Sequence, residues 1–281
     1  MLFIGSSSKI IHEPKGVTLI LTPWNYPYQI PVQHLVAAIA AGCTAMIKPS
    51  EFTPHTSAIV KEVLGKVFPE NEVAVIEGDH SISTELLKLK FDHIHFTGSP
   101  AVGKVVMRAA AEHLTSVTLE LGGKSPVIID ETANIDAAVK KITWGKFLNC
   151  GQTCIAPDYI LIHESKKDEF LSKLTSNINK VFGEDAQKSP DISHIINNRH
   201  FNRLKNLLGD AINKGAKVEV GAKMDEGDNF ISPTVLSNIS LDCKLMQEEI
   251  FGPLLPILSY KSEKDVLNLI NSKEKPLALY I

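Results

Sequence analysis

Apolar, β-branched segments alternate with helical segments through the first 123 residues, and this alternation restricts the fold more than any other feature. Strands are expected at 16–21, 44–48, 72–76, 91–96 and 117–121. Helices are expected between them at 31–41, 54–66, 83–88 and 101–112. Apolar strands separated by helices form right-handed crossovers in a parallel sheet that is covered on both faces. We therefore expect an α/β fold that binds its ligands at the carboxyl ends of the strands.

The alternation starts again after Gly122-Gly123, which predicts a boundary between two domains, 1–121 and 122–281. The strands expected in the second domain are 127–129, 159–163, 218–220, 234–236 and 254–260. The helices expected there are 135–147, 166–181, 191–213 and 265–272. The segment 277–281 also has the composition of a strand, and the chain stops inside it. Chain ends usually lie at exposed positions, so a buried strand is an unusual place for a natural terminus.

Composition argues against several classes of protein. A net charge of −3 argues against nucleic-acid binding, which usually requires a basic patch. The four cysteines lack the spacing of a disulfide scaffold or a zinc site, so we expect a reducing compartment and no metal. The amino-terminal segment lacks the features of a signal peptide, and no apolar run approaches the ~20 residues of a membrane span. A cytoplasmic protein without a membrane segment is expected.

A candidate nucleophile follows the helix expected at 135–147. Asn149–Cys154 is predicted to be a glycine-containing loop that presents the Cys154 thiol, and a thiolate is the strongest nucleophile available near neutral pH. Glu120 stands on an apolar strand, where a buried carboxyl group would suit a general base. The alternative for Glu120 is an exposed position at the end of the strand. The other cysteines are expected to be structural: Cys43, Cys150 and Cys243.

The loops after the first two strands carry polar side chains at the expected ligand edge. Asn25, next to Trp24, could donate an N–H to a developing oxyanion. Lys48 and Glu51 could hydrogen-bond the hydroxyls of a ribose. The alternative for Asn25 is a proline-bounded turn with a packed Trp. The alternative for Lys48 and Glu51 is an ordinary solvated turn.

Two later segments could also contact a nucleotide. Gly98 and Ser99 lead into a helix whose start would suit a pyrophosphate, although Gly103 does not complete the usual dinucleotide fingerprint. In an extended segment, Glu249 and Phe251 would point the same way and could hold a ribose and a flat ring. The alternative for Gly98 and Ser99 is a Gly-Ser turn with a helix cap. The alternative for Glu249 and Phe251 is a solvated acid beside a core Phe.

In this order, the motifs resemble those of the aldehyde dehydrogenase superfamily, from about Glu13 to the last residue. The motifs are Pro-Trp-Asn (23–25), Lys-Pro-Ser-Glu (48–51), Phe-Thr-Gly-Ser (96–99), Glu-Leu-Gly-Gly-Lys (120–124), Gly-Gln-Thr-Cys (151–154) and Glu-Glu-Ile-Phe-Gly-Pro (248–253). The segments that resemble the class 3 branch, which includes fatty aldehyde dehydrogenases, are 142–146, 154–159 and 275–280.

The resemblance implies NAD(P)-dependent oxidation of a medium-chain, long-chain or aromatic aldehyde. Cys154 would form a thiohemiacetal and then a thioester, Asn25 would hold the oxyanion, and Glu120 would activate the hydrolytic water. The resemblance assigns cofactor binding to Trp24, Lys48, Glu51, Gly98, Ser99, Gly103, Leu121, Glu249 and Phe251. The Glu51 carboxylate should favour NAD over NADP, although class 3 relatives often accept both.

The resemblance also implies that both domains are incomplete, the NAD(P)-binding domain at its amino end and the α/β catalytic domain at its carboxyl end. A full-length form would be a homodimer, and the fatty aldehyde branch could add a membrane anchor beyond this chain. Two other functions stay open. One is a thiol esterase that uses Cys154 and Glu120 without a nucleotide, and the other is an inactive remnant that binds a nucleotide or partners.

Overall fold

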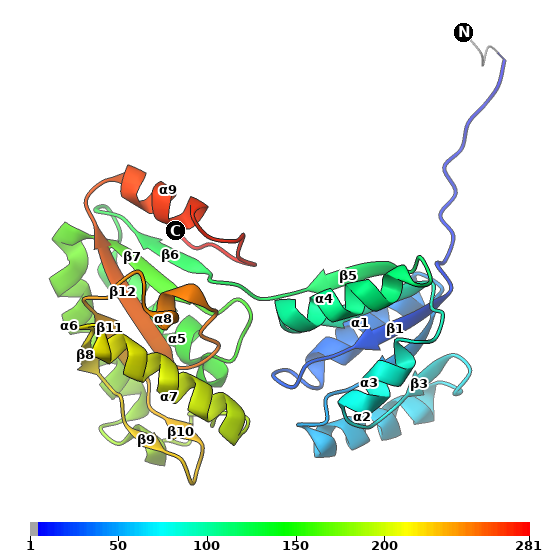
Figure 1. Cartoon of the computed structure of the whole chain (residues 1–281), viewed down its shortest axis with the longest axis horizontal. Helices are drawn as coiled ribbons and strands as arrows, with labels where there is room; N and C mark the ends of the chain where they lie inside the picture. The colour runs from blue at the N-terminus through cyan, green and yellow to red at the C-terminus, as the bar shows by residue number, and fades with distance from the viewer. Residues whose placement is uncertain (1–4) are drawn as a thin grey trace. The chain divides into compact units, whose positions relative to one another are not determined.

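The computed structural model describes residues 5–281 as two compact units, one ending at Leu121 and the other beginning at Gly122 (Figure 1). Each unit is built on its own five-stranded sheet with helices on both faces. The expected α/β class is confirmed in both units. Among residues 5–281, no helix combines the length and the apolar character that a membrane span requires.

In the first unit, all neighbouring strands are parallel, in the order β3-β2-β1-β4-β5. The strands are β1 (Val17–Leu21), β2 (Thr44–Lys48), β3 (Val73–Val75), β4 (His93–Thr97) and β5 (Ser116–Glu120). The helices are α1 (Gln29–Ala40), α2 (Pro54–Val67), α3 (His80–Leu86) and α4 (Pro100–Ala111). Pro54 and Pro100 stand at helix starts, where the missing N–H of proline leaves no hydrogen bond unmade.

Two apolar clusters divide this sheet into faces. Ile20 and Ile47 pack with Leu35 of α1 and Val60 of α2. On the other face, the strand residues Leu19 and Phe96 pack with residues of α3 and α4: Leu86, Val106 and Ala110. Successive strand side chains point to opposite faces, so this division follows directly from the sequence.

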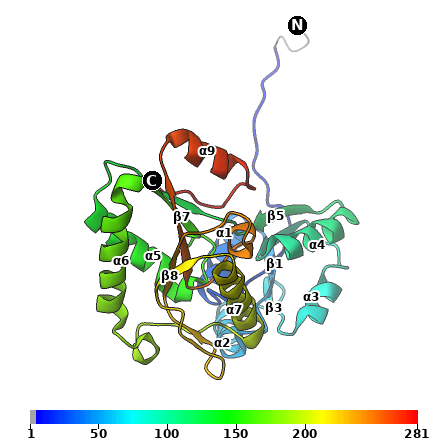
Figure 2. The ribbon, with the colours of Figure 1, turned by 60° about the vertical axis from the view of Figure 1, so that its left-hand side comes forward.

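The second unit has the strand order β6-β7-β12-β11-β8, in which only β8 is antiparallel to its neighbour. The strands of this sheet are β6 (Pro126–Ile129), β7 (Tyr159–His163), β8 (Lys217–Val220), β11 (Thr234–Ser237) and β12 (Leu254–Tyr260). The helices are α5 (Ile135–Phe147), α6 (Lys167–Phe182), α7 (Asn198–Asn213), α8 (Lys244–Gln247) and α9 (Glu263–Asn271). Residues of α5 and α6 pack on one face, and those of α7, α8 and α9 pack on the other. Figure 2 shows α6 and α7 on opposite sides of the strands.

The sequence located every strand of the two main sheets to within about two residues at either end. The helix expected at 191–213 is wrong in its first part, because α7 begins at Asn198. Asn197 caps it by accepting a hydrogen bond from the His200 backbone N–H at 3.0 Å. The backbone before this cap forms hydrogen bonds outside the helix, since the Ile195 N–H donates to the Asn229 carbonyl oxygen at 3.0 Å.

The smaller elements were not predicted. They are the hairpin of β9 (Met224–Asp225) and β10 (Phe230–Ile231), and the short helix α8. The strand expected at 277–281 is reduced to a parallel bridge between Tyr280 and Val127. Tyr280 donates its N–H to Pro126 at 3.0 Å and accepts from Ile128 at 2.8 Å, so this segment lies along the outer side of β6.

Candidate active site

In the first unit, the loops singled out in the sequence leave the same edge of the sheet, because all five strands are parallel. Trp24 and Asn25 follow β1 and are half-buried. Backbone hydrogen bonds hold neighbouring strand ends together: Thr22 donates to the Lys48 carbonyl oxygen at 3.2 Å, and Gly98 donates to that of Glu120 at 3.0 Å. The candidate oxyanion donor, ribose-binding pair, phosphate loop and base of this unit therefore share one edge.

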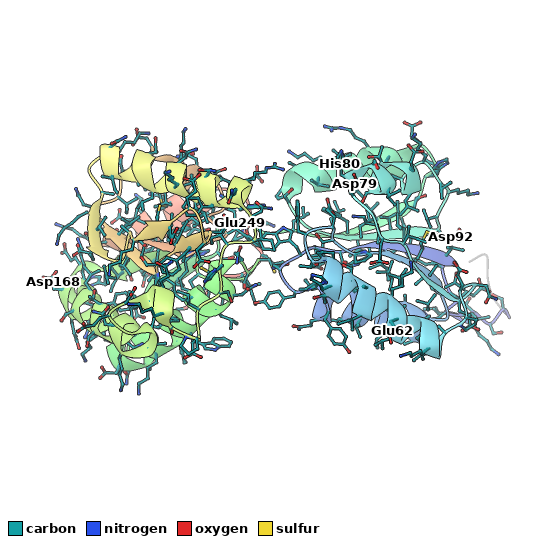
Figure 3. The ribbon with its side chains drawn as sticks, turned by 90° about the horizontal axis from the view of Figure 1, so that it is seen from below. Glu62, Asp79, His80, Asp92, Asp168 and Glu249 are labelled. Carbon is teal, nitrogen blue, oxygen red and sulfur yellow. The ribbon has the colours of Figure 1, made fainter. Side chains whose placement is uncertain are left out.

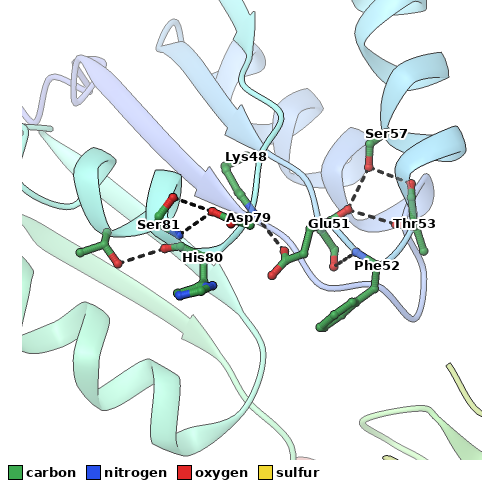
Figure 4. A network of polar contacts seen from close by, with 10 residues as sticks. Lys48, Glu51, Phe52, Thr53, Ser57, Asp79, His80 and Ser81 are labelled. Carbon is green, nitrogen blue, oxygen red and sulfur yellow. Dashed lines mark hydrogen bonds and ion pairs between the residues drawn. The ribbon is translucent and has the colours of Figure 1, made fainter. Parts of the chain in front are cut away.

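The loop after β2 presents a cation and an anion together. Lys48 is only 4% exposed, and its Nζ donates to Glu51 Oε2 at 3.0 Å (Figure 4). The Ser50 carbonyl oxygen accepts a hydrogen bond from the Ser57 hydroxyl at 3.1 Å, which ties this loop to α2. The Glu51 side chain is 31% exposed, and a hydrogen bond from this pair to a ribose stays a prediction.

The loop after β4 needs its glycines. A Cβ on Gly98 would lie 2.5 Å from the Phe96 ring, and one on Gly103 would lie 3.0 Å from Leu121 Cδ2. Ser99 caps α4 by accepting from the Val102 N–H at 3.4 Å. The N-cap predicted at Ser99 is therefore present, and a contact with pyrophosphate stays a prediction.

Glu120 is exposed, so the expected burial on an apolar strand is wrong. It is the last residue of β5, and β5 is an edge strand of the described sheet. Solvent reaches the carboxyl group because no further strand covers that side. The structure shows the alternative, in which Glu120 is exposed at the end of the strand. Water can therefore reach its carboxylate.

In the second unit, the cysteine loop has an unusual backbone. Asn149, Cys150 and Gly151 have φ angles of 50°, 56° and 72°, so three consecutive residues are left-handed. Such conformations persist only where the surroundings hold them, and they concentrate at functional sites. The buried Gln152 supplies that support: its side chain donates to the His194 carbonyl oxygen and accepts from the Ile196 N–H, both at 3.0 Å.

The two cysteines of this loop have different environments. Cys150 is 1% exposed, and burial raises the pKa of its thiol to about 12, so it packs and does not react. Cys154 is half-buried and lies at the end of the loop. Beside it, the Tyr280 hydroxyl donates to the Ile155 carbonyl oxygen at 2.6 Å. The accessible thiol is therefore Cys154.

A second loop of this unit carries Glu249, which is labelled in Figure 3. Burial raises the pKa of its carboxyl group to about 7, and the Gly123 N–H donates to it. A Cβ on Gly122 would lie 2.2 Å from Glu249 Oε1, so the glycine pair makes room for the carboxyl group. Phe251 has a φ of 46°, so this segment is not extended. The expectation that an extended backbone points Glu249 and Phe251 the same way is therefore wrong.

The cysteine loop and the Glu249 loop pack directly on each other. A Cβ on Gly151 would lie 2.3 Å from the Gly252 carbonyl oxygen. Arg203 on α7 supports the same loop by donating to the Glu249 carbonyl oxygen at 3.1 Å. Within the second unit, the structure thus brings together the loops that carry Cys154, Glu249 and Phe251.

Sequence reasoning missed a buried ion pair that fixes the Glu249 loop. The Lys124 ammonium contacts the Asp158 carboxylate and also donates to the carbonyl oxygens of Leu245 at 2.8 Å and Glu248 at 3.0 Å. Asp158 Oδ1 accepts from the Ile250 N–H at 2.8 Å. Both charged residues lie inside motifs quoted above, but nothing in their spacing shows that they pair.

Breaking this pair should destabilise the second unit strongly. In Lys124→Met, the Asp158 carboxylate is left buried without its cation, which costs about 3–5 kcal/mol. Lys61→Met is the matched control, because it breaks the exposed 3.3 Å pair with Glu77, which contributes no more than about 1 kcal/mol. Urea unfolding measures both free energies, and equal losses in the two variants would show that the buried pair has no special role.

The sequence and the fold of this chain are both similar to those of known proteins. A model described as "Aldehyde dehydrogenase family" matches residues 4–281. The rat protein named aldehyde dehydrogenase family 3 member A2 is 50% identical over 269 residues, 96% of this chain and 54% of the relative. The rat protein named aldehyde dehydrogenase, dimeric NADP-preferring, is 45% identical over 96% of this chain and 58% of its own length.

The fold also matches solved structures. The structure titled "Substrate bound state of Staphylococcus Aureus AldH" superposes with a TM-score of 0.91 at 47% sequence identity. The match covers 95% of this chain and 58% of that one. The chain thus spans little more than half the length of the relatives that it matches.

Proposed function

The chain belongs to the aldehyde dehydrogenase family, and we propose that the protein containing it oxidises an aldehyde to the carboxylic acid with NAD(P). The observation that carries the proposal is the half-buried Cys154, set at the end of a left-handed loop that Gln152 anchors. A thiol held in this way can attack a carbonyl carbon. The proposed substrates are medium-chain, long-chain or aromatic aldehydes, as the class 3 resemblance implies.

Each residue is assigned one task in this chemistry. The Cys154 sulfur forms a bond to the carbonyl carbon, and the Asn25 amide and the Cys154 N–H hold the resulting oxyanion. Once the carbon of this thiohemiacetal has lost its hydride, the acyl group stays on Cys154 as a thioester. Glu120 then takes a proton from water as the water adds to the thioester, and the Cys154 thiolate leaves.

The described residues fit a dinucleotide. The Lys48–Glu51 pair suits the hydroxyls of a ribose, and the start of α4, which Ser99 caps, suits a pyrophosphate. We assign binding of the nicotinamide end to Glu249 and Phe251 and of the remainder to Trp24, Lys48, Glu51, Gly98, Ser99, Gly103 and Leu121. When bound, NAD(P) supplies the hydride acceptor.

Glu51 should set the choice between NAD and NADP. Its carboxylate would repel a 2′-phosphate, so Glu51→Gln should raise the ratio of kcat/KM for NADP to that for NAD by about tenfold, or ~1.4 kcal/mol. Glu62→Gln is the matched control, because it removes an equal charge from an exposed pair with Lys66 on α2. An unchanged ratio in Glu51→Gln would remove Glu51 from the specificity assignment.

A panel of aldehydes with NAD or NADP tests the proposed function, with reduced nicotinamide as the readout. We expect turnover of straight-chain and aromatic aldehydes by the protein that contains this chain. Ester cleavage without nucleotide and without aldehyde oxidation would instead identify a thiol esterase. Nucleotide binding without any reduced nicotinamide would identify an inactive remnant. For the whole protein we also propose a homodimer, since the class 3 resemblance implies one and a rat relative is named as dimeric.

A further inference from the structure

One face of β4 and β5 is polar. The parallel register pairs His93 with Ser116, His95 with Thr118, and Thr97 with Glu120. The alternating residues Ile94 and Phe96 belong to the core on the opposite face. The polar row therefore shares its face with α1, and it ends at the proposed base Glu120.

Helix α1 places one further histidine against this row. The His34 ring centroid lies 3.6 Å from that of His95, with the planes tilted by 42°. The His34 Nε2 atom lies 3.4 Å from Thr97 Oγ1, within hydrogen-bonding distance. Because Thr97 is the cross-strand partner of Glu120, these two contacts hold the His34 imidazole next to the base.

The titratable groups that share this face with His34 include His95, His93 and Glu120. His95 beneath it stays neutral, because burial lowers its pKa to about 4. His93 lies farther along β4, and burial followed by the Lys15 charge lowers its pKa. Burial also lowers the pKa of His34, whereas the Glu120 carboxylate opposes that effect. Glu120 is thus the negative charge that favours a proton on His34.

We propose that His34 is a positioning residue that couples hydrolysis at Glu120 to pH. Neutral His34 leaves the Glu120 carboxylate available to take a proton from water. Protonated His34 forms a charge pair with that carboxylate and withdraws it from the water. The inference rests on the proposed role of Glu120, and it adds regulation by pH through His34, a residue outside the motifs.

The protonation of His34 determines how the rate of thioester hydrolysis changes with pH. Below the pH at which His34 becomes charged, thioester hydrolysis slows, and above it hydrolysis is fast. His34→Gln cannot take up this proton but can still bond Thr97. The acidic limb of its hydrolysis rate should therefore move to lower pH by about half a unit or more, with the rate at neutral pH kept within about twofold.

The test is the pH profile of carboxylic acid release in a single turnover, measured by chemical quench in the protein that contains this chain. His34→Phe is a second variant, because it keeps a ring against His95 and also lacks the proton. We expect both variants to shift the acidic limb in the same direction. A merely structural role would lower the rate evenly at every pH and leave the limb in place, and that result would overturn the proposal. Failure of the proposed function looks different, since the unaltered protein would then release no acid at any pH.

Discussion

Cys154→Ala is expected to lower kcat/KM for aldehyde oxidation by about 10,000-fold or more, the size of effect seen when a covalent nucleophile is removed. Without the sulfur, neither the thiohemiacetal nor the thioester can form, and no other described residue of the cysteine loop can replace it. Cys150 is the thiol nearest to Cys154 in the sequence, but it is buried and its pKa is raised to about 12. Initial rates with an aldehyde and NAD measure the loss.

The matched control is Cys150→Ala in the same loop. This change removes a buried sulfur that lies 3.9 Å from the Ile231 carbonyl oxygen, so it should cost stability but not chemistry. We expect kcat/KM within about threefold of the unaltered protein and a lower melting temperature. If Cys154→Ala kept normal turnover, or if Cys150→Ala were the inactive variant, the assignment of the nucleophile would be wrong.

Glu120→Gln should separate the two halves of the reaction. In the proposed mechanism hydride transfer precedes the water step, so the first turnover should still release about one reduced nicotinamide per active site. Steady-state turnover should then fall by about 100- to 10,000-fold, which is the range for loss of a general base. Rapid mixing resolves the burst from the slow phase that follows.

Glu112→Gln is the control for charge alone, because Glu112 is an exposed carboxylate that follows α4 in the same unit. It should leave both phases unchanged. Equal losses of the burst and of steady-state turnover in Glu120→Gln would mean that Glu120 acts before or during hydride transfer. That result would contradict its assignment to hydrolysis.

Local patterns explain why much of the fold could be predicted. Alternating apolar residues such as Ile20 and Ile47 determine which strands are buried, and Pro54 and Ser99 mark helix starts through chemistry within a few residues. The packing role expected for Cys150 agrees with its burial.

The features that were missed depend on contacts between distant parts of the chain. The pair of Lys124 and Asp158 forms only after β6 and β7 lie side by side. The left-handed backbone at Phe251 has no local signal, because a bulky residue rarely adopts a positive φ. The exposure of Glu120 depends on β5 being an edge strand, which the order of strands along the sequence does not reveal.

His34 illustrates the same limit for the site. It lies within an ordinary helical segment, and only the docking of α1 on the sheet brings it to Thr97 and His95. No motif marks it. A residue of this kind can be found only after the sheet register places Glu120 beside Thr97.

Acylation of Cys154 is measured most directly by the mass of the Cys154 peptide after Glu120→Gln protein is mixed with an aldehyde and NAD and then denatured in acid. We expect an added acyl group on Cys154 that forms only when both aldehyde and NAD are present and that hydroxylamine removes. An acyl group on another cysteine, an adduct that forms equally without NAD, or reduced nicotinamide produced without any acylated Cys154 would contradict this expectation.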